Sequence, residues 1–386
     1  MLKTPKSIFI SFLITSLGIL AFGDLMVVSA AQVTGLTTSG SSFAISAKQL
    51  LLTVVSLIVA WVIAQFPLTS VKWFAKRSLI LAIGSMALLI PFGRNINGNT
   101  NWISFGPIDL QPSEFAKLFL VLWAALIIER NLNNPILVFR SLLTGFGVVL
   151  GIVLIGQDLG SAVVIGLILA TLVYLAGAQL RQLAVIASFG IFGVVTLILI
   201  QPYRIARFTA FLHPFAPDIY KNAGWQPAHS LLALGSGGFF GSGLGSSKQK
   251  WGNLAEAHTD FIFSVIGEEL GLLGTITLIT ALAFLVYLII KISLMAPDTF
   301  SRYLGLGIAF WIGLQSLFNL LSATSLIPVV GVTLPLISYG GSSLVAVVGA
   351  LGYVAGIAVR NPEISEEINT RWPLQPRRRN RSKVNK

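Results

Sequence analysis

The chain alternates between long apolar stretches and shorter polar connections, and this pattern predicts its secondary structure. A helix needs about 20 mainly apolar residues to cross a lipid bilayer. Ten stretches reach that length, give or take a few residues: 8–30, 47–66, 77–93, 114–130, 136–156, 159–178, 182–201, 261–291, 304–324 and 336–359. The sequence therefore predicts an all-α, polytopic membrane protein with about ten transmembrane helices. The long eighth stretch predicts a helix that is tilted or continues beyond the lipid.

Two polar segments interrupt this pattern. Residues 202–260 form a Gly-rich connection between the seventh and eighth stretches, and residues 95–112 form a shorter one. Loops longer than about 15 residues in a compact protein are usually functional or disordered. The longer segment holds four large aromatic residues: Trp225, Phe239, Phe240 and Trp251. We therefore expect a large extracytoplasmic loop at about 202–260 that folds onto the mouth of the bundle.

Positive charge gathers on one side of the predicted bundle. The short connections after the even-numbered stretches contain Lys72, Lys76, Arg77, Arg130, Arg181 and Arg302, whereas the opposite short connections contain little beyond Lys48 and Arg94. Loops rich in Lys and Arg stay on the cytoplasmic side of a membrane. Together with Lys3 and Lys6, this pattern places both termini in the cytoplasm and requires an even number of crossings. The predicted domains are a transmembrane domain over 1–360 and a basic cytoplasmic tail over 361–386.

Composition supports the membrane assignment and narrows the partners. Hydrophobic residues make up 55% of the chain and charged residues only 10%, whereas charged residues make up about 25% of a soluble domain. The formal net charge of +12 would suggest nucleic-acid binding in a soluble protein, but eight basic residues lie at or beyond Arg360. Such a juxtamembrane tail is typical of contact with anionic lipid, and we expect no nucleic-acid partner. The absence of Cys excludes disulfides, thiolate nucleophiles and Cys-type zinc sites.

The fourth stretch opens with Gln111-Pro-Ser-Glu114-Phe-Ala-Lys117. Proline suits the first position of a helix, and a carboxylate suits its positive dipole end. Glu114 and Lys117 are three residues apart, so they share a helix face and can pair. The pair is either a structural ion pair or a cationic site for an anionic substrate in which Glu114 tunes Lys117.

The end of the longer polar segment is richest in candidate chemistry. A Gly-rich run at 236–245 precedes Lys248 and Lys250. Glycine lets backbone N–H groups approach a phosphate, and the two lysines add positive charge. Glu256-Ala-His258-Thr-Asp260 follows, directly before the eighth stretch. Asp260, beside His258, could act as a general base or cap the next helix.

Other acidic residues lie at membrane depth, where they are costly. We expect Asp24 to be a helix-facing or interfacial acid and Asp158 to cap the sixth helix. Glu268 and Glu269 would need a partner or a proton, and Lys117 is a candidate partner for one of them.

The last stretch opens with Leu334-Pro-Leu-Ile-Ser338-Tyr-Gly-Gly-Ser342-Ser343. Paired glycines with hydroxyl groups at membrane depth indicate close backbone approach or a polar cavity. The segment therefore either contacts substrate through Ser338 and Ser342 or forms a tight structural break.

Together these motifs resemble the SEDS family (shape, elongation, division and sporulation), which includes FtsW, RodA and SpoVE. The resemblance covers nearly the whole chain, and the motifs are more similar to the division branch than to the elongation branch. Its most specific parts are Asn101-Trp102-Ile with Gln111-Pro-Ser-Glu114, Ala233-Leu-Gly-Ser-Gly-Gly238 to Lys250, Glu256-Ala-His-Thr-Asp-Phe-Ile-Phe263 with Gly267-Glu-Glu-Leu-Gly271, and Leu334 to Ser343.

This resemblance implies a ten-helix peptidoglycan glycosyltransferase that polymerises lipid II into β-1,4 glycan strands on the outer face of the cytoplasmic membrane, for septal wall synthesis. It also implies a class B penicillin-binding protein (a transpeptidase) as partner, together with other divisome proteins. The family's essential aspartate maps onto Asp260, and its outer-loop Trp onto Trp102. The chain departs from the family pattern at four positions: Gln157, where a proline is usual, Asn101, His229 and Ala255.

On this interpretation Asp260 deprotonates the acceptor hydroxyl and a pyrophosphate leaves the donor. The leaving group needs neutralising charge, which we expect from basic side chains or from a divalent cation such as Mg²⁺ or Mn²⁺. The predicted substrate-binding residues are Trp102, Glu114, Lys117, Arg204, Arg207, Lys248, Lys250, His258, Ser338 and Ser342.

Two other functions remain open from the sequence. A lipid II flippase would place a polar site at the midplane, for example through Lys117 and Glu268. A non-catalytic scaffold for the transpeptidase would tolerate the loss of Asp260. The polar motifs cluster on the outer side, which favours the enzyme.

Overall fold

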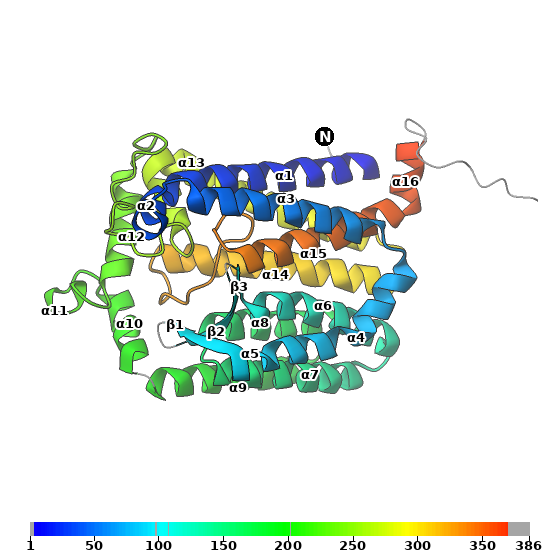
Figure 1. The fold of residues 1–386 in the computed structure, drawn as a ribbon. Coiled ribbons are helices and arrows are strands. Elements are labelled where there is room, and N and C mark those ends of the chain that lie inside the picture. The colour runs from blue at the N-terminus through cyan, green and yellow to red at the C-terminus, as the bar shows by residue number, and fades with distance from the viewer. Residues whose placement is uncertain (1–3, 97–98, 107, 201, 370–386) are drawn as a thin grey trace, which may run out of the picture.

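The computed structural model describes residues 4–369, except 97–98, 107 and 201. Long helices run side by side in a bundle, and a small sheet and short helices, among them α2, α10, α11 and α12, lie at one end (Figure 1). We call this end the site end. The helices are α1 (Pro5–Ala30), α2 (Gln32–Ser39), α3 (Ala44–Gln65), α4 (Leu68–Ala87), α5 (Leu89–Phe92), α6 (Pro112–Asn131), α7 (Pro135–Ile155), α8 (Leu159–Leu175), α9 (Leu180–Ile200), α10 (Pro202–Leu212), α11 (Pro217–Tyr220), α12 (Trp225–Ser236), α13 (Ile262–Leu294), α14 (Thr299–Ala323), α15 (Gly341–Arg360) and α16 (Pro362–Asn369).

Each of the ten predicted stretches coincides with a helix, namely α1, α3, α4, α6, α7, α8, α9, α13, α14 and α15. Within the described residues, seven helices are long and apolar enough to cross a bilayer, and α8 and α9 provide shorter apolar segments. Helix α6 is not among these seven, and it carries four charged residues, Glu114, Lys117, Glu129 and Arg130. The polytopic helical fold is confirmed, and ten crossings stay a prediction.

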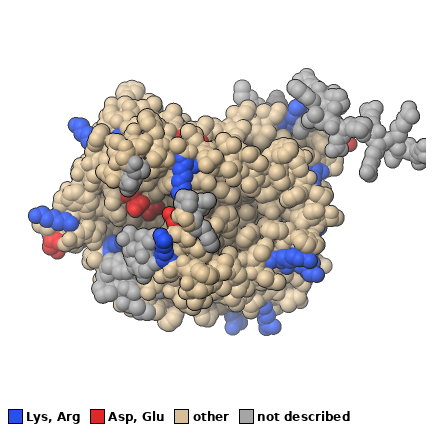
Figure 2. All heavy atoms as spheres, viewed as in Figure 1, with Lys and Arg blue, Asp and Glu red and all other residues tan. Residues whose placement is uncertain are grey.

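The outer surface of the bundle is suited to lipid. Large apolar side chains such as Ile14, Ile80 and Ile155 are more than 65% exposed, which a protein in water would avoid in such number. Figure 2 shows a broad band without charged side chains between the two ends of the molecule. The chain is therefore an integral membrane protein. Helix α1 begins and α16 ends at the same end, opposite the site end (Figure 1), and residues 370–386 of the predicted tail lie outside the described residues.

The shorter polar segment contains a three-stranded antiparallel sheet that the sequence pattern did not predict. Its strands are β1 (Gly93–Ile96), β2 (Asn99–Phe105) and β3 (Ile108–Leu110), in the order β1-β2-β3. Trp102 on β2 is paired with Arg94 on β1. The strands are three to seven residues long and rich in Asn, so apolar alternation was too short to reveal them.

The longer polar segment is partly helical, and its helices α10, α11 and α12 cover less than half of it. Helix α12 packs on α13. The Ser230 hydroxyl donates to the carbonyl of Ala323 (2.6 Å) and lies 2.6 Å from the Ser264 hydroxyl. These contacts seat the segment on the ends of α13 and α14.

Helix α13 corresponds to the long eighth stretch, but it is broken at Gly271, where φ is 66° and ψ is −162°. Main-chain groups of residues 238–243 bond to both sides of the break. Ser242 N donates to Glu268 O (3.0 Å), Gly243 N to Glu269 O (3.0 Å), and Leu272 N to Gly238 O (2.9 Å). Irregular backbone at membrane depth is tolerated where the protein supplies such partners.

The two glutamates before the break are fully paired. Lys250 Nζ lies 3.0 Å from Glu269 Oε1, which also accepts from the Ser29 hydroxyl (2.7 Å). Glu268 accepts from the Ser247 hydroxyl and from Lys248 N (2.9 Å). The expectation that Lys117 pairs with one of these glutamates is wrong. Lys250, in the longer polar segment, pairs with Glu269, and Lys117 pairs with Glu114.

Candidate functional site

A cavity of about 840 Å³ lies at the site end. Its walls come from the sheet, the starts of α3 and α8, α10, residues 255–260, residues 327–333 and residues 339–343. Figure 2 shows acidic atoms recessed between basic side chains near this end. Segments far apart in the sequence therefore meet around one hollow. A cavity of this size suits a substantial organic ligand.

The cavity brings together five of the predicted site residues: Trp102, Arg207, His258, Asp260 and Ser342. Trp102 reaches it from β2, and Arg207 from α10. Arg204 also belongs to α10, but its side chain lies outside the described residues.

Asp260 lies in the last turn before α13 and does not cap that helix. The N-cap residue is Phe261, and it makes no side-chain capping bond. Asp260 instead lines the cavity, and the residue is partly buried. Burial raises its pKa from 3.8 to about 7; nearby Glu256 and Asp158 add to the rise, and Arg207 opposes it. A carboxylate with this pKa is suited to accept a proton near neutral pH.

His258 and Glu256 flank this carboxyl group. Burial lowers the pKa of His258 despite the charge of Glu256, so the imidazole is neutral at pH 7. Its Nδ1 is buried with no partner among the described residues. Glu256 adopts a left-handed backbone conformation (φ 57°) and accepts a hydrogen bond from the Thr259 hydroxyl (2.7 Å).

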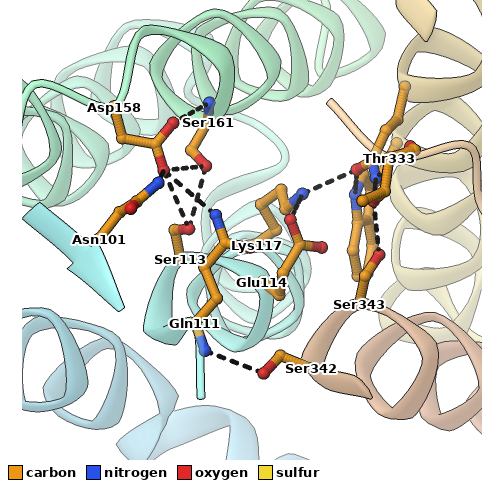
Figure 3. Close-up of polar contacts among 12 residues, drawn as sticks. Asn101, Gln111, Ser113, Glu114, Lys117, Asp158, Ser161, Thr333, Ser342 and Ser343 are labelled. Carbon is orange, nitrogen blue, oxygen red and sulfur yellow. Dashed lines mark hydrogen bonds and ion pairs between the residues drawn. The ribbon is translucent and has the colours of Figure 1, made fainter. Parts of the chain in front are cut away.

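Asp158 ties three parts of the wall together, as Figure 3 shows. Its Oδ1 accepts from Ser161 N (3.0 Å), so Asp158 caps α8 as predicted. Its Oδ2 accepts from the Ser161 hydroxyl (2.8 Å) and lies 3.3 Å from Asn101 Nδ2 and 3.4 Å from Gln111 Nε2. The Ser342 hydroxyl accepts from Gln111 N (2.9 Å). These hydrogen bonds connect the sheet, the start of α8 and the start of α15.

Glu114 and Lys117 form the predicted ion pair, at 2.8 Å, but it lies behind the cavity wall (Figure 3). Both side chains are buried, and Lys117 also donates to Gln315 Oε1 (2.7 Å). They line a separate hollow of about 10 Å³, too small for a substrate. In this structure the pair supports the wall and does not contact the cavity.

Three further predicted site residues also lie outside the cavity. Lys250 is buried against Glu269, and Lys248 is exposed on the surface, with its N–H bonded to Glu268. The Ser338 hydroxyl donates to Thr259 O (2.6 Å) and accepts from Leu334 N (2.8 Å). The Gly-rich run therefore wraps the break in α13, and Ser338 holds backbone.

Sequence reasoning did not select Lys48, Glu256 or Tyr339, which also line the cavity. Lys48 lies near the start of the second predicted stretch, 47–66. Nothing in the sequence pairs it with Asp260, because they are more than 200 residues apart.

A metal ion fits poorly with the side chains present. No group of three or more His, Asp and Glu residues is placed to hold one within the described part of the chain.

Comparison with known proteins agrees with this architecture. The family described as cell cycle protein, which covers FtsW, RodA and SpoVE, matches residues 9–363. A protein of Aeromonas salmonicida named probable peptidoglycan glycosyltransferase FtsW is 36% identical over 364 residues, covering 93% of this chain and 92% of the relative. A protein of Coxiella burnetii with the same name is 36% identical over 355 residues, covering 89% and 94%.

Two solved structures share the fold. The rod shape determining protein RodA of Thermus thermophilus superposes with a TM-score of 0.65 at 27% identity, covering 91% of this chain and 96% of that chain. A chain from a peptidoglycan synthase complex that coordinates polymerization and crosslinking gives a TM-score of 0.69 at 26% identity, covering 90% and 96%. The chain therefore belongs to the FtsW, RodA and SpoVE family of cell cycle proteins.

Proposed function

We propose that this chain is a peptidoglycan glycosyltransferase that polymerises lipid II into β-1,4 glycan strands. The observation that carries the proposal is the placement of Asp260, a carboxyl group with a pKa of about 7, in a large cavity at the site end. The family relatives named above carry the same activity in their names.

The reaction needs one base. Asp260 takes the proton from the 4-hydroxyl of the acceptor sugar, and that oxygen forms a bond to the anomeric carbon of the donor. The bond from this carbon to the pyrophosphate oxygen breaks, and the electron pair leaves with the pyrophosphate. The carbon is inverted, and the proton stays on Asp260. One carboxylate suffices because a pyrophosphate needs no strong acid to leave, unlike the sugar alcohol released by paired acids in glycosidases.

Charge for the pyrophosphate comes from the cations on the cavity wall, Arg207 and Lys48. Arg207 also lowers the pKa of Asp260, which places its charge close to the base. Fixed cations that meet developing negative charge lower a barrier efficiently. A divalent cation, Mg²⁺ or Mn²⁺, carried in on the pyrophosphate is the alternative source of this charge.

The membrane arrangement follows from the same proposal. The site end faces the outer side of the cytoplasmic membrane, and both termini face the cytoplasm, because the short loops at the opposite end are richer in Lys and Arg than the short loops at the site end. The membrane domain spans 1–360, and the basic tail spans 361–386.

A class B penicillin-binding protein is the proposed partner. The synthase complex that shares this fold combines polymerization with crosslinking, and a transpeptidase supplies the crosslinking. The relatives named FtsW favour a place among divisome proteins and a role in septal wall synthesis.

The test is polymerisation of lipid II by the purified chain with its transpeptidase, comparing wild type, Asp260→Ala and Asp218→Ala. Asp218 is an exposed carboxylate on α11, away from the cavity, so its loss controls for removal of one negative charge. Glycan from wild type and Asp218→Ala, but not from Asp260→Ala, supports the proposal. Glycan from Asp260→Ala refutes the base. No glycan from wild type, with the partner and a divalent cation present, favours a flippase or a scaffold.

A further inference from the structure

The backbone that carries Asp260 is held at three consecutive carbonyl groups. Tyr339 N donates to His258 O (2.8 Å), and the Ser338 hydroxyl donates to Thr259 O (2.6 Å). Asn319 Nδ2 donates to Asp260 O (2.9 Å). All three donors come from outside the segment, so its position depends on α14 and on the residues before α15.

Asn319 differs from the other two donors because it joins two walls of the cavity. It lies on α14 and is 1% exposed. Its second amide proton goes to Val332 O (2.7 Å), next to the cavity-lining Gly331 and Thr333. The two walls nearly touch, because a Cβ atom added at Gly331 would lie 3.5 Å from Asp260 Oδ2. The Asn319 side chain thus bonds both to the residue that carries the carboxylate and to the opposite wall.

The amide of Asn319 uses its N–H donors and leaves its oxygen unbonded among the described residues. Its Oδ1 is buried without a partner among the described residues, which is costly. Rotating the amide by 180° would aim that oxygen at two carbonyl oxygens, so the donor orientation is fixed. A polar side chain inside a membrane helix that leaves its own oxygen unpaired needs a compensating role.

We propose that Asn319 is a positioning residue that holds the base Asp260 against the wall formed by residues 331–333. This inference rests on the proposed function. Acceptor and base must meet within hydrogen-bond reach, and misplacement by about 1 Å can lower a rate by about 100-fold. The loss should therefore appear in kcat and not in substrate binding.

The charged and titratable groups that line the cavity with Asp260 are Glu256 and His258 on its own segment, Arg207 on α10, Asp158 before α8, Lys48 on α3, Asp109 on β3 and Tyr339 before α15. None of them is changed by replacing Asn319. Burial is the largest cause of the raised pKa of Asp260, so freeing its backbone should admit water and move that pKa down.

The experiment compares wild type, Asn319→Leu and Ser316→Ala in the complex with the transpeptidase, with Asp260→Ala as the inactive reference. Leucine has the branched shape of asparagine and the same number of side-chain heavy atoms, and it removes both donors. Ser316 is a buried residue one turn earlier on α14 whose hydroxyl bonds only within its own helix, to Ile312 O (2.8 Å). We expect kcat of Asn319→Leu to fall at least about tenfold, KM to stay within about twofold, and the rising limb of the pH profile to move to lower pH. Ser316→Ala should keep the wild-type profile.

A fall in activity that follows the folded fraction, with the pH limb unmoved, would overturn the inference and leave Asn319 a stability residue. Unchanged kcat would also overturn it. Should Asn319→Leu fail to fold, Asn319→Ser, which keeps one donor, is measured in the same way. An inactive wild type would count against the proposed function itself, so the two failures are distinguishable.

Discussion

The buried Lys250–Glu269 pair offers a quantitative test of how the longer polar segment, residues 202–260, is anchored to α13. Both side chains are 0% exposed. In Lys250→Met, the Glu269 carboxylate would keep only neutral donors, the Ser29 hydroxyl and Ser247 N. Breaking a buried pair by removing one partner costs about 3–5 kcal/mol, because a buried charge is left uncompensated. We expect a decrease of that size in the free energy of unfolding.

The matched control is Lys72–Glu129, an ion pair between α4 and α6 whose side chains are 31% and 24% exposed. Such partly solvated pairs contribute about 0–1 kcal/mol. The assay is the apparent Tm of the purified protein in one detergent at one scan rate, because membrane proteins often unfold irreversibly. The single variants Lys250→Met and Glu269→Gln and the double variant Lys250→Met/Glu269→Gln complete a mutant cycle.

The double variant should be more stable than Lys250→Met, because glutamine removes the stranded charge and keeps the hydrogen bonds. The reasoning is refuted if Lys250→Met lowers Tm no more than Lys72→Met does. It is also refuted if the double variant loses the sum of the two single losses.

Three further predictions follow from the cavity and from α13. The pH profile of kcat/KM should rise through about pH 7, because Asp260 acts only when deprotonated and its pKa is about 7; Glu256→Gln should move that limb to lower pH, since Glu256 raises the pKa, and an unmoved limb would exclude this coupling. Arg207→Gln should move the limb to higher pH and raise KM for lipid II, which initial rates across pH will show; a change in neither would place Arg207 outside the site. Gly271→Ala should lower Tm, because the backbone there has φ 66° and the new Cβ would lie 2.3 Å from Gly241 N, while Gly166→Ala in α8, with nothing within 4 Å, should not; equal Tm values for both would argue against the strain.

Local patterns predicted what local forces decide. The i,i+3 spacing of Glu114 and Lys117 predicted their ion pair, and the position of Asp158 before α8 predicted its cap; both are confirmed. The apolar stretches located the helices, because each must hide its backbone from lipid within one segment.

Long-range partners could not be read in the same way. Lys250 and Glu269 carry no mark that selects them for each other, since any buried acid would accept any lysine. The same holds for Asn319, whose two acceptors are main-chain carbonyls that every residue possesses. The break at Gly271 left only a weak signal, glycines and two acids inside an apolar run, which also fits a continuous helix.

The break in α13 constrains how the chain is assembled in the membrane. The carbonyls of Glu268 and Glu269 would face hydrocarbon unpaired until Ser242 and Gly243 bond to them, and such groups are costly in lipid. Residues 237–250 precede α13 in synthesis, so in the proposed orientation they are already on the outer side of the membrane when α13 enters. The helix therefore completes its insertion by docking onto a segment translocated before it, and the order of synthesis becomes part of the folding pathway.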